Sequence, residues 1–156
     1  MRASDALVGQ DGIVLALGPE ARVEEDRSAA PSGLGEVLQA AAVDSAYRRF
    51  SGRFGPDATP FAVAELALVF DSPDTAAKTF VHVAEAAHMR TQIEGADVAV
   101  ETVTAANGMV SYWGYVHLGA IITVLTVDSL NPQQVSIAAL RALVTQVAGR
   151  LEAAKG

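Results

Sequence analysis

The chain contains no cysteine. This absence excludes disulfide bonds, thiolate zinc ligands and a cysteine nucleophile. It does not prevent folding, because a chain of 156 residues is long enough to build a core without cross-links. At this size roughly 68–70% of the surface of the unfolded chain is buried on folding. The missing cysteines therefore limit the chemistry of the protein and leave its fold open.

Aromatic and basic residues are also scarce. Phe, Trp and Tyr make up 6% of the chain, so a core must consist mainly of Ala, Val, Leu and Ile. The 11 lysines and arginines face 18 acidic residues, which gives a net charge of -7. Binding to nucleic acid or to anionic lipid needs a concentrated positive surface. We therefore expect no nucleic-acid partner.

One stretch, 47–54 (YRRFSGRF), interleaves basic and aromatic residues, as single-strand nucleic-acid platforms do. In an acidic chain, such a stretch is more typical of a surface strand whose arginines pair with nearby carboxylates. Arg49 and Arg53 are also candidates for a second role, because a guanidinium can receive the carboxylate or phosphate of a ligand or partner. Both residues therefore enter the candidate site.

Long apolar runs are missing as well. No run reaches the roughly 20 residues that a membrane-spanning helix needs, and residues 1–10 contain no apolar segment of a signal peptide. We expect neither a transmembrane segment nor an export signal within this chain. On these grounds the protein is either cytoplasmic, or exported and seen without its export signal.

Hydrophobic periodicity and turn signals predict an irregular N-terminal segment, residues 1–32, and a single α+β domain, residues 33–156. Within the first segment, Gly12–Leu17 reads as one short strand. In the second we expect helices at 34–43, 73–90 and 132–153, begun by Ser32, Ser72 and Asn131, and strands at 47–54, 61–70, 98–104, 109–118 and 120–128. Hairpins between these strands predict an antiparallel sheet in the order β-α-β-β-α-β-β-β-α, with the helices packed on one face.

The strongest local signal is Asn107-Gly108, which separates two alternating segments. This pair is typical of a type I′ turn, in which both residues take a positive φ. A two-residue loop would place Val103 opposite Tyr112. The loop therefore predicts which side chains share a face of the sheet.

On that register neither face of the meander is polar. One face carries Val98, Val100, Trp113, Tyr115, His117, Ile122 and Val124, and the other carries Val103, Val110, Tyr112, Val116, Ile121, Leu125 and Val127. An antiparallel sheet with one solvated face would alternate between apolar and polar residues. Both faces must therefore be covered, or one of them is a binding surface.

The aliphatic face suits the helices, whereas the other face has a different character. Trp113, Tyr115 and His117 combine apolar rings with polar tips, a composition found in ligand pockets and subunit interfaces. Three occupants of this face stay open: the N-terminal segment or a loop of the same chain, a second copy of the chain in a homodimer, and a small apolar molecule.

Motifs for metals and cofactors are missing. His82, Glu85 and His88 form H-x-x-E-x-x-H, but steps of three place the two histidines on different sides of a helix. Zinc proteases instead use histidines at i and i+4. The segment Gly33-Leu34-Gly35 lacks the third glycine of a dinucleotide-binding loop. We therefore expect neither a metal site nor a cofactor.

Glu65 is the one charged residue in the strand expected at 61–70. A buried Glu65 would have a raised pKa and could act as a general acid or base. A salt bridge to Arg49 or Arg53 of the neighbouring strand would make it structural, and this is the simpler expectation. The two readings differ in whether the carboxylate is buried.

The order of these segments resembles a known family. It consists of Tyr47-Arg48-Arg49-Phe50, a strand ending in Val69-Phe70-Asp71-Ser72, a helix with Ala76-Ala77, an aromatic strand, Gly119, a β-branched strand and an amphipathic C-terminal helix. Over about residues 34–153 it resembles the extracytoplasmic domains of uncharacterised bacterial lipoproteins and secreted proteins with a PsbP-like antiparallel α+β fold. The resemblance implies export and a non-catalytic binding or assembly role, and it supplies no catalytic residues.

The sequence therefore favours a non-enzymatic binding or assembly module of the cell envelope, which uses its aromatic sheet face for a small apolar ligand or for self-association. The candidate ligand or interface residues are Trp113, Tyr115, His117, Glu65, Arg49 and Arg53. One alternative is a small acid/base enzyme with a pocket around Glu65 and His117, and another is a scaffold protein with a large symmetric interface. An extracytoplasmic location is favoured, and a cytoplasmic one stays open.

Overall fold

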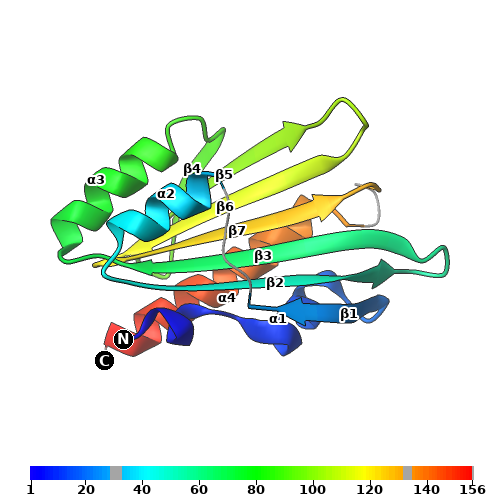
Figure 1. Ribbon diagram of the computed structural model, residues 1–156, viewed down its shortest axis with the longest axis horizontal. Helices are drawn as coiled ribbons and strands as arrows, with labels where there is room; N and C mark the ends of the chain where they lie inside the picture. Colours follow the sequence, from blue (N-terminus) through cyan, green and yellow to red (C-terminus); the bar gives the residue numbers. More distant parts are fainter. Residues whose placement is uncertain (29–32, 132–134, 156) are drawn as a thin grey trace.

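A seven-stranded antiparallel sheet in the order β1-β2-β3-β7-β6-β5-β4 forms the centre of the computed structural model, which describes residues 1–28, 33–131 and 135–155 (Figure 1). The strands are β1 (Ala21–Arg27), β2 (Asp44–Phe54), β3 (Thr59–Val69), β4 (Met89–Ile93), β5 (Ala96–Thr104), β6 (Val110–Leu118) and β7 (Ile121–Ser129). The helices are the 3-10 turn η1 (Ala3–Ala6), α1 (Gly9–Leu17), α2 (Leu34–Ala41), α3 (Pro73–Val83) and α4 (Ile137–Lys155).

The predicted antiparallel α+β architecture is confirmed, but the helices cover both faces of the sheet and not one. α4, α1 and η1 pack on one face, and α2 and α3 pack on the other (Figure 1). The reason is visible in β7, where Leu125 and Val127 face α4 while Ile122 and Val124 face α2 and α3. A strand that is apolar on both sides is stable only when both sides are covered.

The larger core lies under α4. The apolar stripe of this helix consists of Leu140, Leu143, Val144, Val147 and Leu151, and all five side chains are buried. They pack against the side of the sheet that carries Val116, Leu125 and Val127. This agrees with the prediction that the aliphatic face suits the helices.

The N-terminal segment is not irregular. Gly12–Leu17, expected as a strand, lies within helix α1, because its buried residues Ile13 and Leu17 are four apart and so share one side of a helix. The chain then forms the edge strand β1, whose run of charged residues suits an exposed sheet edge. Residues 3–17 pack on the α4 face, so Gly12–Leu17 lies on the side of the sheet opposite Trp113.

The predicted helix over 73–90 starts as expected and ends early. The Ser72 hydroxyl accepts a hydrogen bond from the Thr75 N–H at 3.2 Å, and Pro73 opens the helix. The helix stops at Val83, however, and residues 89–93 form the edge strand β4. Residues 89–93 pair with β5, so their backbone groups form hydrogen bonds within the sheet and the helix does not continue through them. The expected starts of the other two helices, at Ser32 and at Pro132, lie outside the described residues.

The register of the β5–β6 hairpin differs from the predicted one by a single residue. Val103 lies opposite Ser111 and not opposite Tyr112. Five residues, 105–109, connect the two strands, and among them only Gly108 takes a positive φ, at 83°, so a type I′ turn does not form. The shift turns Val98 and Val100 to the α4 face. It brings Ala99 and the acidic residues Asp97 and Glu101 to the face of Trp113.

Candidate ligand groove beside helix α2

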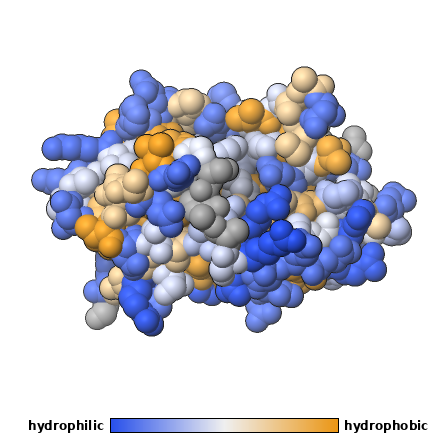
Figure 2. All heavy atoms as spheres, viewed as in Figure 1, coloured by the Kyte–Doolittle hydropathy of each residue, from blue (hydrophilic) through white to orange (hydrophobic). Residues whose placement is uncertain are grey.

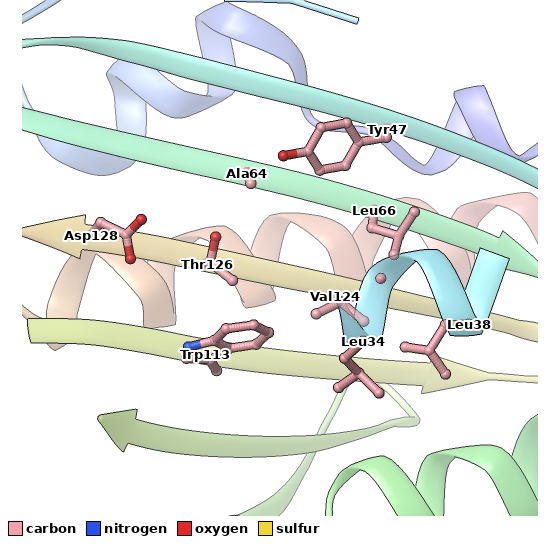
Figure 3. Close-up of a pocket in the computed structure, with 10 residues that line it drawn as sticks. Leu34, Leu38, Tyr47, Ala64, Leu66, Trp113, Val124, Thr126 and Asp128 are labelled. Atoms are coloured by element: carbon pink, nitrogen blue, oxygen red, sulfur yellow. The ribbon is translucent and has the colours of Figure 1, made fainter. Parts of the chain in front are cut away.

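A groove of about 180 Å³ opens on the face that carries α2 and α3, beside α2 (Figure 3). It is lined by Leu34, Gly35, Leu38, Tyr47, Ala64, Leu66, Trp113, Val124, Thr126 and Asp128. These residues come from α2 and from the four adjacent strands β2, β3, β7 and β6. The groove is larger than the ~150 Å³ that holds a benzene molecule in an engineered cavity.

Residue size across the sheet creates the groove. One cross-strand row runs from Arg49 through Ala64 and Thr126 to Trp113. The two middle positions carry small side chains, and the end positions carry large ones. Small residues in the centre of a row leave a hollow that the flanking side chains border, because neighbouring strands are about 4.8 Å apart. Figure 3 shows Ala64 and Thr126 between the rings of Tyr47 and Trp113.

Helix α2 closes one end of the groove. Leu38 is buried against the sheet, and Leu34 is 43% exposed at the border of the groove. The spacing of four residues puts both side chains on the same side of the helix. In the close-up both side chains project from α2 on the side away from Leu66, and Leu34 lies next to Val124 (Figure 3).

Trp113 is held in place by its neighbour. Its ring stacks on the ring of Tyr115, with the centroids 6.4 Å apart. Tyr115 is buried, and its hydroxyl donates a hydrogen bond to Glu101 at 3.4 Å. Burial and the charge of Glu101 raise the pKa of Tyr115 above its ordinary value, so its hydroxyl stays a donor. Trp113 is itself only partly buried, so its ring is held by the buried Tyr115 and still borders the groove.

Asp128 forms the polar end of the groove. Its Oδ1 accepts a hydrogen bond of 2.6 Å from the Ser111 hydroxyl. It also lines a second, more open hollow of about 270 Å³ with Arg49, Ser51 and Met109. Asp128 lines both hollows, so they adjoin at this residue, whereas Arg49 lines only the second one.

His117 lies under α3 and does not line the groove. Its ring stacks on Phe80 with the centroids 5.2 Å apart. Nδ1 lies 3.3 Å from the Asp97 carboxylate and Nε2 lies 3.0 Å from the Gly119 carbonyl oxygen. The pKa of Asp97 is lowered, mainly by a hydrogen bond from Gln92 and to a smaller extent by its contact with His117. Both ring nitrogens are occupied, so this histidine has a packing role.

Glu65 lies on the opposite face of the sheet and makes no salt bridge to Arg49 or Arg53. Its side chain is fully buried and accepts hydrogen bonds from the backbone N–H groups of Val8 at 2.8 Å and Gly9 at 3.2 Å. Burial raises its pKa above the ordinary value, and these hydrogen bonds oppose the shift only in part. The expected salt bridge was wrong because the sequence did not reveal that the start of α1 would cover this strand.

The arginines that entered the candidate site lie at different distances from the groove. Arg49 is exposed and borders the second hollow. Arg53 lies near the β2–β3 turn, where it donates a hydrogen bond to the Ala58 carbonyl and lies 3.9 Å from Glu24. The cross-strand neighbour of Glu65 is Arg48, and Arg48 forms a salt bridge of 2.8 Å with Asp26.

The structure therefore groups three of the six predicted site residues. These are Trp113, the residue on which its ring stacks, Tyr115, and, at the adjoining hollow, Arg49. It separates His117, Arg53 and Glu65 from them. Sequence reasoning missed Tyr47, Ala64, Thr126 and Asp128. These residues meet because β3 pairs with β7, and that contact joins segments about sixty residues apart in the chain, as Ala64 and Thr126 illustrate.

The described residues form neither a metal-binding cluster nor a membrane-spanning helix. No group of three or more His, Cys, Asp or Glu side chains there could hold a metal ion. His82 belongs to α3 while His88 lies beyond its end, so the H-x-x-E-x-x-H pattern is not on one helix. Among residues 1–28, 33–131 and 135–155, no helix is both long and apolar enough to span a bilayer.

Comparisons with known proteins bear on the fold. No protein-family model and no curated protein matches the sequence. Among solved structures, the extracellular domain of PknH from Mycobacterium tuberculosis matches with a TM-score of 0.57 and 10% identity, over 98% of this chain and 94% of that chain. A protein from Bacteroides thetaiotaomicron matches with a TM-score of 0.45 and 15% identity, over 81% of this chain and 40% of that chain. The chain is thus similar in fold to an extracellular domain, and the more specific PsbP-like resemblance stays a prediction.

Proposed function

We propose that the protein is a non-enzymatic binding module that holds a small, largely apolar molecule in the groove beside α2. The observation that carries the proposal is the partly buried Trp113 at the wall of a preformed hollow, with Tyr47 on the other side of that hollow. Ligand sites are typically preformed concave surfaces lined by apolar and aromatic side chains with a few polar groups. This groove has that composition, with Thr126 and Asp128 as its polar groups.

The exposed surface favours a ligand over a large interface. On the face that carries α2 and α3, hydrophobic residues are visible in separate places among hydrophilic ones (Figure 2). Val37, Val81 and Val103 are exposed on different elements. An interface between stable partners would need a contiguous patch that contributes several hundred square ångströms from each partner. Binding of a second copy is therefore the weaker of the two uses of this face.

An acid/base enzyme around Glu65 and His117 has less support. Glu65 faces α1 and α4, whereas His117 faces α3, so the sheet lies between them. Neither residue lines any of the hollows described above. The proposal therefore assigns no catalytic residue.

We also place the protein in the cell envelope as part of this proposal. The support is the shared fold with the extracellular domain of PknH and the resemblance seen in the sequence. Fractionation of a bacterium that expresses the full natural chain would test the location, and recovery in the cytosol would contradict it.

Native mass spectrometry of gently purified protein tests the binding function. We expect a monomer that carries an added non-protein mass, and that mass should be absent from Ala64→Leu, which fills the groove floor. Val81→Ser, on the exposed side of α3, is the matched control and should keep the added mass. A dimer without added mass would support self-association instead, and a bare monomer under all conditions would argue against both.

A further inference from the structure

We infer that the ligand of this groove carries a positively charged nitrogen, as a quaternary ammonium or a primary amine, on a small apolar body. This inference rests on the proposed function and names the chemical class of its ligand. It follows from three observations in the groove: two aromatic rings on its two sides, one acidic side chain at the polar end, and the absence of basic side chains from the described lining.

The two rings form opposite walls. Tyr47 projects from β2 and Trp113 from β6, and the close-up shows their rings on the two sides of the groove (Figure 3). β3 and β7 lie between these strands, so the backbones are about 14 Å apart at the usual strand spacing. The face of an aromatic ring carries partial negative charge and attracts cations, and Trp is the strongest of the aromatic residues in this respect. Groups of such rings are a common recognition site for quaternary ammonium ligands.

Asp128 supplies the charge. It is the one ionisable group of the lining besides the Tyr47 phenol. Its Oδ1 accepts from Ser111, and no other described residue forms a hydrogen bond or ion pair with the carboxylate. Arg49 borders the adjoining hollow but forms no ion pair with Asp128, and its exposed charge is screened by solvent. Among the described residues the carboxylate therefore has no cationic partner, and a bound cation would supply one.

The charge of the whole molecule acts in the same direction. A net charge of -7 attracts cationic ligands and repels anionic ones of the same shape. An anionic ligand in this groove would face Asp128 without a compensating lysine or arginine in the described lining. Neutral apolar ligands would use the rings and leave the carboxylate unpaired.

The experiment compares three soluble probes of nearly equal shape: choline, its neutral carbon analogue 3,3-dimethyl-1-butanol, and the anion 3,3-dimethylbutanoate. Trp113 is the only tryptophan of the chain, so its fluorescence reports binding in the groove directly, and calorimetry provides a second readout. We expect choline to bind at least about tenfold more tightly than the alcohol, and the anion to bind most weakly.

Two variants separate charge from shape. Asp128→Asn keeps the size of the side chain and an acceptor for Ser111, and it should weaken choline binding about tenfold while leaving the alcohol unchanged. Asp11→Asn removes the same unit of charge from the exposed surface of α1, on the other face of the sheet, and should change neither. An unchanged choline affinity in Asp128→Asn would overturn the inference.

The outcomes distinguish this inference from the function on which it rests. Equal binding of choline and the alcohol would overturn the cationic ligand and leave an apolar groove that binds small molecules. Failure of all three probes, together with a bare monomer in native mass spectrometry, would overturn both. Preferential binding of the anion would point to Arg49 and the second hollow and would also contradict the inference.

Discussion

Glu65 illustrates how one residue is assigned by its tertiary surroundings. The sequence shows a lone carboxylate inside an apolar strand, which is compatible with catalysis or with a salt bridge. The structure shows instead that it accepts the backbone N–H groups of Val8 and Gly9 at the start of α1. The neighbouring carbonyls of Leu7 and Val8 accept hydrogen bonds from Arg150 at 2.7 and 3.1 Å. Glu65 therefore fixes the N-terminal segment on the sheet.

Removal of this carboxylate should lower the free energy of unfolding. In Glu65→Ala the two N–H groups lose their acceptor, and each buried donor left without a partner costs about 1–3 kcal/mol. We expect a loss of roughly 2–4 kcal/mol in urea denaturation at pH 7. A loss below ~0.5 kcal/mol would contradict the role assigned to Glu65.

The raised pKa of Glu65 also makes stability depend on pH. The folded-state pKa lies above the ordinary value of 4.5, so the unfolded chain gives up this proton more readily. The stability that the fold gains from holding this proton on Glu65 is therefore fully present below pH 4.5, and it is lost as the pH rises through the folded-state pKa. Glu65→Gln does not titrate, so the stability of the wild type relative to this variant should fall as the pH rises above 4.5. A constant difference, measured by denaturation at several pH values, would contradict the raised pKa.

At the scale of elements, glycines decide how closely strands and helices approach. Gly114 lies on β6 under α4, and a Cβ there would be 2.7 Å from Val144 Cγ1 and 3.1 Å from Leu140 Cδ1. Gly108 has free space around it but takes a φ of 83°. The first glycine is needed for packing, and the second is needed for the turn that sets the β5–β6 register.

Substitution of the two glycines should separate these causes. Gly114→Ala forces α4 away from β6, and overpacking of this kind costs about 1–3 kcal/mol. Val144→Ala should relieve the clash, so the double variant should be more stable than the sum of the single changes predicts. Gly108→Ala should cost about 1 kcal/mol through backbone strain alone, with no rescue by Val144→Ala. If the effects of Gly114→Ala and Val144→Ala on the free energy of unfolding simply add in urea denaturation, a Cβ at position 114 does not clash with Val144.

At the scale of the whole molecule, the N-terminal segment is part of the fold. Ile13 is fully buried against the α4 core, whereas Leu15 on the same helix is 76% exposed. Figure 1 shows this segment beside α4 and below β1 and β2. Residues 3–17 of this segment thus complete the face of the sheet opposite the groove.

A matched pair on α1 tests this placement. Ile13→Ala should lower the free energy of unfolding by about 2–5 kcal/mol, because it leaves a cavity in the core. Leu15→Ala should change it by less than ~0.5 kcal/mol, because the side chain is exposed. Equal effects of the two changes in thermal or urea denaturation would indicate that α1 does not pack on the sheet.

The sequence by itself determined the fold class and most of the elements. The Ser72-Pro73 helix start, the strand around Glu65 and the apolar stripe of α4 follow from local chemistry and periodicity, which depend on residues close together in the chain. It also determined that both faces of the meander would be covered or used in binding, because neither alternates with polar residues.

Only the tertiary structure decided what covers each face and where the groove lies. The order of the strands places β3 beside β7, and that pairing of distant segments brings Tyr47, Ala64, Thr126 and Asp128 to Trp113. A shift of one residue at Gly108 exchanged the β5 side chains between faces, since side chains alternate along a strand. Long-range pairing and register depend on the free energy of the whole fold, and no single stretch of sequence contains that information.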